Sequence, residues 1–142
     1  MTGVITLTDI AERFHDTALP FFMIGEIESN LRKCLSAGLS EEAIRAVQPK
    51  KQQTGKVTDL MFGQYLKLIR AEANNPASIA ATAANWQALG RQGVDRDRFI
   101  SQLSRVKDIR NHIAHFGSRP PGAEDIDTLR RFSELLKMLV WH

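Results

Sequence analysis

One apolar stripe in the C-terminal third of the sequence most constrains how this chain folds. At 100° per residue, the apolar side chains of residues 96–116 gather on one helix face: Phe99, Leu103, Val106, Ile109 and Ile113. A helix with one apolar face has to bury that face against another element. No segment after Thr8 alternates with the period of a strand, so we expect the partners to be helices. The sequence therefore predicts an all-α fold, an antiparallel bundle of four to five helices.

Capping residues and helix breakers divide the chain into the expected helices. We expect helices over residues 19–37, 40–48, 58–71, 77–89, 96–116 and 123–140. Pro20 suits the first turn of the first of these helices, and Gly38 suits its end. Ser40, the pair Thr58 and Asp59, and Asp95 are typical caps at the starts of three others. Residues 48–56 between two helices are expected to form a polar, basic loop.

The first residues differ in character from the rest of the chain. In the stretch GVITLTDIAERF, residues 3–14, the β-branched residues before Thr8 favour a strand, and Thr8 and Asp9 can cap a short helix. A single strand with no neighbour in sequence has nothing to pair with. We therefore predict an N-terminal arm over residues 1–16 and a helical domain over residues 17–142.

Charge, cysteine usage and hydrophobicity exclude some classes of protein. The net charge of +3 and the pI near 9.3 permit an anionic partner without requiring one. Cys34 is the single cysteine, so no disulfide can form within the chain, and a buried, small apolar role is expected for it. No apolar run reaches the roughly 18 residues that a membrane span needs, and no signal peptide is recognisable. These features together predict a cytoplasmic protein that is not embedded in a membrane.

A charged residue interrupts each of two apolar helix faces. Position 110 lies on the apolar face of helix 96–116, where the periodicity favours leucine, but the residue is Arg110. Glu28 interrupts the apolar face of helix 19–37 in the same way. An unpaired buried guanidinium is very costly, so we expect Arg110 and Glu28 to meet across the helix interface. Such a pair could serve only to fix the helix register, or it could belong to a functional site.

The residues after Arg110 favour the functional interpretation. Asn111 and His115 are four positions apart and therefore share a helix face outside the core. The pattern of Arg110, Asn111 and His115 near the end of a core helix resembles the signature of the HEPN superfamily. In that signature an arginine and a polar residue are followed by a histidine a few positions later. Glu28 matches the acidic position that many members carry on their first helix.

The resemblance to HEPN proteins implies a function. Many members are endoribonucleases that need no metal and act as homodimers, with a composite site at the dimer interface. Arg110, Asn111 and His115 would then be the catalytic residues, with Glu28 and His112 in support. Histidine titrates near neutral pH, so His115 can move a proton, while Arg110 stays charged and can bind phosphate oxygens. The expected products are a 2′,3′-cyclic phosphate and a 5′-hydroxyl.

Other side chains near the motif suggest contacts with RNA. Arg105, Lys107 and Arg119 could follow an RNA backbone, or they could form an ordinary solvated basic face. His112 could add a proton-transfer group, or it could simply be solvated. His112 and His115 have no third candidate ligand nearby in the sequence, so we expect no metal. We also expect no cofactor and no DNA substrate.

A second resemblance concerns the N-terminal arm. Residues 3–14 resemble the closing strand and helix of a CBS domain, a module that senses adenosyl nucleotides; Thr6 and Asp9 match its ribose- and phosphate-contacting positions. Residues 20–35 and 62–69 resemble the HEPN subgroup found behind CBS domains. The match at 3–14 is short, so we expect a remnant and predict no nucleotide binding from it.

Three hypotheses about function follow. The first is a homodimeric HEPN ribonuclease, such as a toxin in stress or phage defence, with an antitoxin or regulatory partner. The second is a catalytically inactive HEPN-like module that binds RNA or protein, or that dimerises and relays the signal of a CBS sensor. The third is a helical assembly domain in which Arg110 and Glu28 only fix the register.

Overall fold

Helices joined by loops make up the described part of the chain. The computed structural model describes residues 7–90, 93–116 and 122–140, with side chains described from residue 18 on, except at 114–116 and 140. Its α-helices are α1 (Leu7–Gly38), α2 (Glu41–Val47), α3 (Phe62–Ile69), α4 (Pro76–Ala88), α5 (Arg96–Phe116) and α6 (Ala123–Val140). Two short 3₁₀ helices, Lys50–Gln52 and Val57–Asp59, lie between α2 and α3. The predicted all-α class is confirmed for these residues, none of which is in a strand.

Helix α1 is longer than predicted. It runs without a break from Leu7 to Gly38, so the predicted start at residue 19 is wrong, whereas the predicted end at Gly38 is confirmed. Pro20 lies inside the helix, where it cannot donate a backbone hydrogen bond. Its ring is fully buried, and this packing offsets the lost bond. The continuous helix crosses the predicted boundary between residues 16 and 17, and the strand-like residues before Leu7 lie outside the described part.

Most predicted caps are confirmed. The Ser40 hydroxyl accepts the Ala43 N–H at 3.2 Å at the start of α2. One carboxylate oxygen of Asp95 accepts the Asp97 N–H at 3.0 Å at the start of α5. These side chains satisfy backbone donors that the first turn of a helix leaves without partners.

The predicted start of the third helix is wrong. Asp59 accepts a hydrogen bond from the Thr54 hydroxyl at 2.7 Å and therefore belongs to the preceding loop. Helix α3 begins at Phe62 instead, where the side-chain oxygen of Gln64 accepts the Met61 N–H at 2.7 Å. The polar loop itself is organised around the buried Gln48, whose side-chain oxygen accepts the Gly55 N–H at 2.9 Å.

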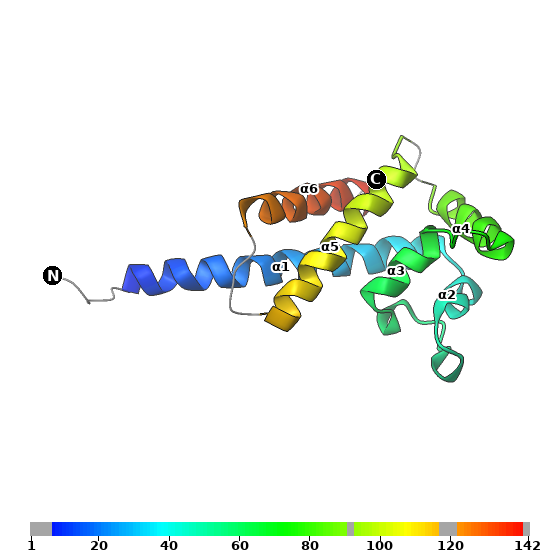
Figure 1. The fold of residues 1–142 in the computed structure, drawn as a ribbon, viewed down its shortest axis with the longest axis horizontal. Coiled ribbons are helices and arrows are strands. Elements are labelled where there is room, and N and C mark those ends of the chain that lie inside the picture. Colours follow the sequence, from blue (N-terminus) through cyan, green and yellow to red (C-terminus); the bar gives the residue numbers. More distant parts are fainter. Residues whose placement is uncertain (1–6, 91–92, 117–121, 141–142) are drawn as a thin grey trace.

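Helices α1 and α6 form the largest helix–helix contact in the described structure (Figure 1). They lie side by side and run in the same direction, and α5 crosses them obliquely. The predicted antiparallel arrangement therefore does not describe this pair. The fully buried core side chains include Ile27 and Leu31 in α1, Leu66 and Leu68 in α3, Leu103 and Val106 in α5, and Leu129, Phe132 and Leu136 in α6. An ion pair between Lys137 and Glu26 at 2.8 Å joins α6 to α1 at the surface.

One further prediction about the core, the burial of Cys34, is confirmed. Cys34 is buried, with 5% of its surface exposed. Trp86 packs against the core, with its ring centroid 5.4 Å from that of Phe99. The second tryptophan, Trp141, lies outside the described residues.

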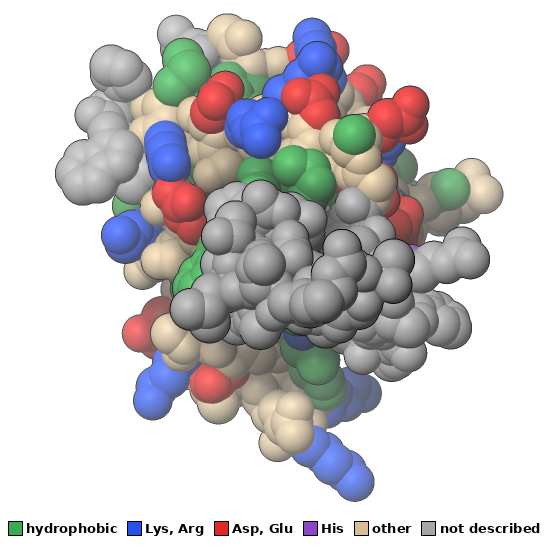
Figure 2. Space-filling model, turned by 90° about the vertical axis from the view of Figure 1, so that its left-hand side faces the viewer, with side chains coloured by type: hydrophobic (Ala, Val, Ile, Leu, Met, Phe, Trp, Pro, Cys, Tyr) green, Lys and Arg blue, Asp and Glu red, His purple; other side chains and the backbone are tan. Residues whose placement is uncertain are grey.

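The surface seen from the end where α1 begins carries charges of both signs. Among the described side chains on this face, acidic and basic groups are mixed (Figure 2). Large apolar side chains are also exposed on α1 and α6, including Phe21, Phe22 and Met138. Within the described ranges, no helix is both long enough and apolar enough to cross a membrane.

Arg96 joins three helices at the first turn of α5. Its guanidinium donates to the Ile69 carbonyl at 2.7 Å and 3.1 Å, and to the Thr82 hydroxyl at 3.0 Å. The Ile69 carbonyl is in the last turn of α3, where the helix itself supplies no partner. Thr82 is buried in the middle of α4. One side chain therefore fixes the end of α3 against α4 and α5.

Replacing Arg96 with methionine tests this role. The variant keeps most of the side chain's apolar length but leaves the Ile69 carbonyl and the Thr82 hydroxyl without their donor. We expect the free energy of unfolding to fall by about 2 kcal/mol, measured by urea denaturation. Arg98→Met, an exposed arginine on the same helix, should change it by less than about 0.5 kcal/mol. Equal effects of the two substitutions would contradict the structural role of Arg96.

Candidate functional site

A groove between α3 and α5 contains part of the predicted site. It has a volume of about 340 Å³. Lys107, Arg110 and Asn111 line it from α5, where their spacing of three and four residues places them on one helix face. The other side is formed by α3 and the residue before it: Met61, Phe62, Gly63, Gln64 and Lys67.

Arg110 is held at the groove by an aromatic ring and an amide. Its guanidinium carbon lies 5.9 Å from the centroid of the Phe62 ring, within the range of a cation–π interaction. One of its terminal nitrogens donates to the side-chain oxygen of Asn111 at 3.4 Å. Phe62 is buried, while Arg110 is only half-buried. Both neighbours position the guanidinium without cancelling its charge.

The predicted direct pair of Glu28 and Arg110 is absent. Among the described residues, no ion pair joins these two side chains. Both instead act electrostatically on Tyr65, a buried residue of α3. The Tyr65 hydroxyl accepts a hydrogen bond from Nε of Arg32 at 3.1 Å. Glu28 and Arg110 thus both influence the Tyr65 phenol. Among the described residues, no carboxylate neutralises Arg110 in an ion pair.

The pKa of Tyr65 is raised above its usual value of 10.0. Burial is the main cause, because it disfavours the charged phenolate. The hydrogen bond from Arg32 and the charge of Arg110 lower the pKa, and the charge of Glu28 raises it, but burial outweighs the opposing influences. The phenol therefore stays protonated in the folded protein at a pH where the unfolded chain has lost the proton.

The groove is positively charged. Lys67, Lys107 and Arg110 bring three cations to it from two helices, and none of the described residues that line it is acidic. In the described part of the chain, none of these cations forms an ion pair with a carboxylate. Three uncompensated cations around one hollow favour an anionic ligand, and phosphate oxygens suit both the forked guanidinium and the ammonium groups.

The remaining predicted residues are not part of the described groove lining. Arg105 and His112 are exposed on other faces of α5. The backbone at His115 belongs to α5, but its side chain is outside the described residues, as is Arg119. Thr6 and the side chain of Asp9 in the CBS-like stretch also lie outside. The structure thus brings together Lys107, Arg110 and Asn111, while the catalytic roles predicted for Asn111, His115 and His112 stay predictions.

The α3 side of the groove had no role predicted from its sequence. Gln64 and Lys67 are three positions apart on α3, among buried apolar residues. That spacing marks a polar face on a short, otherwise buried helix. It could have identified α3 as a contributor, but nothing in the sequence indicates that this face is opposite Lys107 and Arg110.

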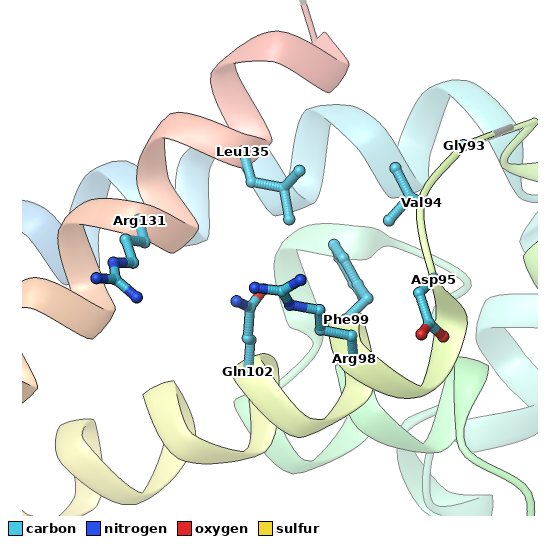
Figure 3. A pocket seen from close by; sticks show the side chains of 8 residues that line it. All are labelled: Gly93, Val94, Asp95, Arg98, Phe99, Gln102, Arg131 and Leu135. Carbon is cyan, nitrogen blue, oxygen red and sulfur yellow. The ribbon is translucent and has the colours of Figure 1, made fainter.

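A second hollow of about 330 Å³ lies between α5 and α6 (Figure 3). Arg98 and Gln102 extend into it from α5, with Arg131 on α6 opposite them. Its lining includes Asp95, and Arg131 forms an ion pair with Asp127 at 3.0 Å. Because carboxylates accompany these cations, the second hollow attracts an anion less strongly than the groove between α3 and α5.

Neither known proteins nor a metal-ligand cluster identifies the family or the function of this chain. No protein-family model, curated protein or solved structure matches this chain. Within the residues that the structure describes, no three His, Cys, Asp or Glu side chains are grouped so that they could hold a metal ion. The candidate site is therefore defined by its own geometry, the cationic groove between α3 and α5.

The Tyr65→Phe variant tests the buried phenol. A group whose folded pKa is raised in this way stabilises the fold below about pH 10, and this stability is lost as the pH rises from 10 toward the folded pKa. Phenylalanine cannot ionise, so unfolding free energy should fall less between pH 7 and pH 11 in the variant than in the wild type. At pH 7 the variant should be less stable by about 1 kcal/mol, because the hydrogen bond from Arg32 is lost.

Tyr65 is the only tyrosine in the sequence, so its titration can be observed directly. The near-ultraviolet absorbance of tyrosinate reports this residue alone. It should rise at a higher pH in the folded protein than in protein unfolded in urea. Identical titration curves for the two states would contradict the burial of the phenol.

Proposed function

We propose that this chain is a HEPN-like endoribonuclease that needs no metal, acts as a homodimer, and binds the RNA backbone in the groove between α3 and α5. The observation that carries the proposal is that Arg110, Asn111 and Lys107 line one groove, and that the described residues of its lining include no carboxylate. The resemblance of Arg110, Asn111 and His115 to the HEPN signature supports the same assignment. A cytoplasmic setting, a role in defence and an antitoxin or regulatory partner belong to this proposal.

The proposed reaction uses the nucleophile that RNA itself carries. The ribose 2′-oxygen forms a bond to the adjacent phosphorus, the bond from phosphorus to the 5′-oxygen breaks, and the products are a 2′,3′-cyclic phosphate and a 5′-hydroxyl. A base takes the proton of the 2′-hydroxyl, and an acid gives a proton to the leaving 5′-oxygen. His115 of one protomer and its counterpart in the second copy fill these two roles.

Arg110 acts on the charge that develops on the phosphate. A guanidinium can donate to two phosphate oxygens at once, and its charge does not change with pH in the neutral range. The absence of a direct pair with Glu28 supports this role, because a carboxylate in contact would compete with the phosphate. Asn111, in contact with Arg110 at 3.4 Å, orients the guanidinium or a ribose hydroxyl.

One observation favours a second candidate function. The described lining of the groove contains groups that bind phosphate but no histidine or carboxylate that could transfer a proton. A binding module needs only the former. The alternative is therefore a catalytically inactive HEPN-like module that binds RNA, or a protein partner, and relays the state of an attached CBS sensor.

A cleavage assay on a mixed RNA pool in EDTA separates these candidates. We expect the wild-type protein to cleave without metal, and His115→Ala to reduce the rate by about 10²- to 10⁴-fold, the usual effect of losing a general acid or base. Arg110→Ala should also reduce it strongly, whereas Arg105→Ala, which removes an exposed arginine outside the groove lining, should change it little.

The ends of the RNA fragments and the effect of EDTA show whether the proposed reaction takes place. Fragments ending in a 2′,3′-cyclic phosphate support the proposed chemistry. Cleavage that EDTA abolishes, or that His115→Ala leaves intact, would contradict it. RNA binding with no cleavage by a dimeric wild-type protein would favour the binding module.

A further inference from the structure

The α3 side of the groove carries an ammonium group and an exposed apolar side chain that the proposed chemistry does not use. Lys67 is exposed, lines the groove and forms no ion pair within the described part of the chain. Met61, just before α3, also lines the groove and exposes 68% of its surface. An apolar side chain so exposed beside three cations contributes little to the core.

Met61 is held in place at the helix start. Its N–H donates to the side-chain oxygen of Gln64 at 2.7 Å, and its carbonyl accepts the Gln64 N–H at 2.9 Å. This reciprocal arrangement fixes the backbone of Met61 at the edge of the groove. The thioether is therefore presented beside the cations on a fixed backbone, at little cost in backbone entropy when a ligand binds.

We infer that α3 reads a single RNA strand in this groove: Lys67 binds a phosphate next to the one on Arg110, and Met61 contacts the face of a base. This inference rests on the proposed RNA-binding function and extends it to residues outside the HEPN-like motif. A strand lying across the groove meets cations from both walls, Lys67 on one and Lys107 on the other. Only an unpaired base exposes its face to an apolar side chain, because a duplex keeps its bases stacked inside.

A substitution at Gly63 provides a test, because it should raise the stability of the fold and weaken RNA binding. It lies in the first turn of α3 and lines the groove, and a Cβ placed there meets no atom within 4 Å. Gly63→Glu should stabilise the helix, because glycine is a poor helix former and an acidic residue suits the first turn. The same substitution puts a negative charge among the three cations. Gly63→Gln adds a similar volume without the charge.

The binding experiment uses the full chain carrying His115→Ala, so that the RNA is not cleaved. Fluorescence anisotropy with a single-stranded oligoribonucleotide, and with the same strand in a duplex, is measured at several salt concentrations. We expect Lys67→Ala to weaken single-strand binding about five- to tenfold and to reduce the slope of log affinity against log salt by about 0.7. Met61→Ala should weaken single-strand binding about three- to tenfold and leave that slope unchanged.

The charge variant should have a larger effect. Gly63→Glu should weaken binding at least tenfold at low salt while its thermal unfolding midpoint stays equal or rises, and Gly63→Gln should bind nearly like the parent protein. Lys33→Ala on the exposed face of α1 and Met138→Ala on α6 are matched controls that should bind like the parent.

The outcomes separate this inference from the proposed function. If Arg110→Ala weakens binding while Lys67→Ala and Met61→Ala behave like their controls, α3 does not read RNA, and the proposed function stands. Binding with the expected α3 effects but no wild-type cleavage would uphold the α3 contacts and overturn the nuclease. Equal affinity for single strand and duplex would overturn the base contact of Met61. No RNA binding at all would overturn both.

Discussion

The guanidinium of Arg96 is the interaction on which the geometry of the groove depends. Helix α3 is only eight residues long, and the groove lies between it and α5. Arg96 stands in the first turn of α5 and satisfies the Ile69 carbonyl in the last turn of α3, while also holding Thr82 of α4. A short helix has little stability of its own, so its position depends on such contacts. The two walls of the groove are thereby fixed at one end by a single side chain.

A charged residue in an apolar stripe is accommodated here without a salt bridge. Arg110 rests over the Phe62 ring and beside Asn111, and remains half-buried, so part of its charge is solvated by water or available to a ligand. In the described residues Glu28 forms no ion pair with Arg110, and the buried Tyr65 is influenced by the charges of both. An arginine locked by a carboxylate would stabilise only the fold. An arginine held by a ring and an amide retains its affinity for anions, which makes the interruption of the stripe functionally useful.

Features that depend on local interactions could be predicted from the sequence, whereas features that depend on tertiary contacts could not. The end of α1 at Gly38 and the caps Ser40 and Asp95 follow from local chemistry and were predictable. The course of α1 through Pro20 depends on burial of the proline ring, and the late start of α3 depends on a loop that uses Asp59; both are tertiary effects. For the site, the HEPN-like pattern singled out Arg110 and Asn111, and Lys107 was expected only as one of several basic side chains near it; their spacing on α5 places the three on one face. Lys67 and Met61 join them only because two helices meet, which spacing along one helix cannot reveal.

The continuity of α1 also affects how the molecule moves in solution. A helix of 32 residues is about 48 Å long, since each residue adds about 1.5 Å along the axis. Its first turns extend beyond the neighbouring α6 in Figure 1. An elongated particle tumbles faster about its long axis than end over end. Backbone N–H vectors along α1 should therefore have longer rotational correlation times than those in α5, which crosses α1 obliquely. NMR relaxation can thus report on the direction of each helix in the intact chain.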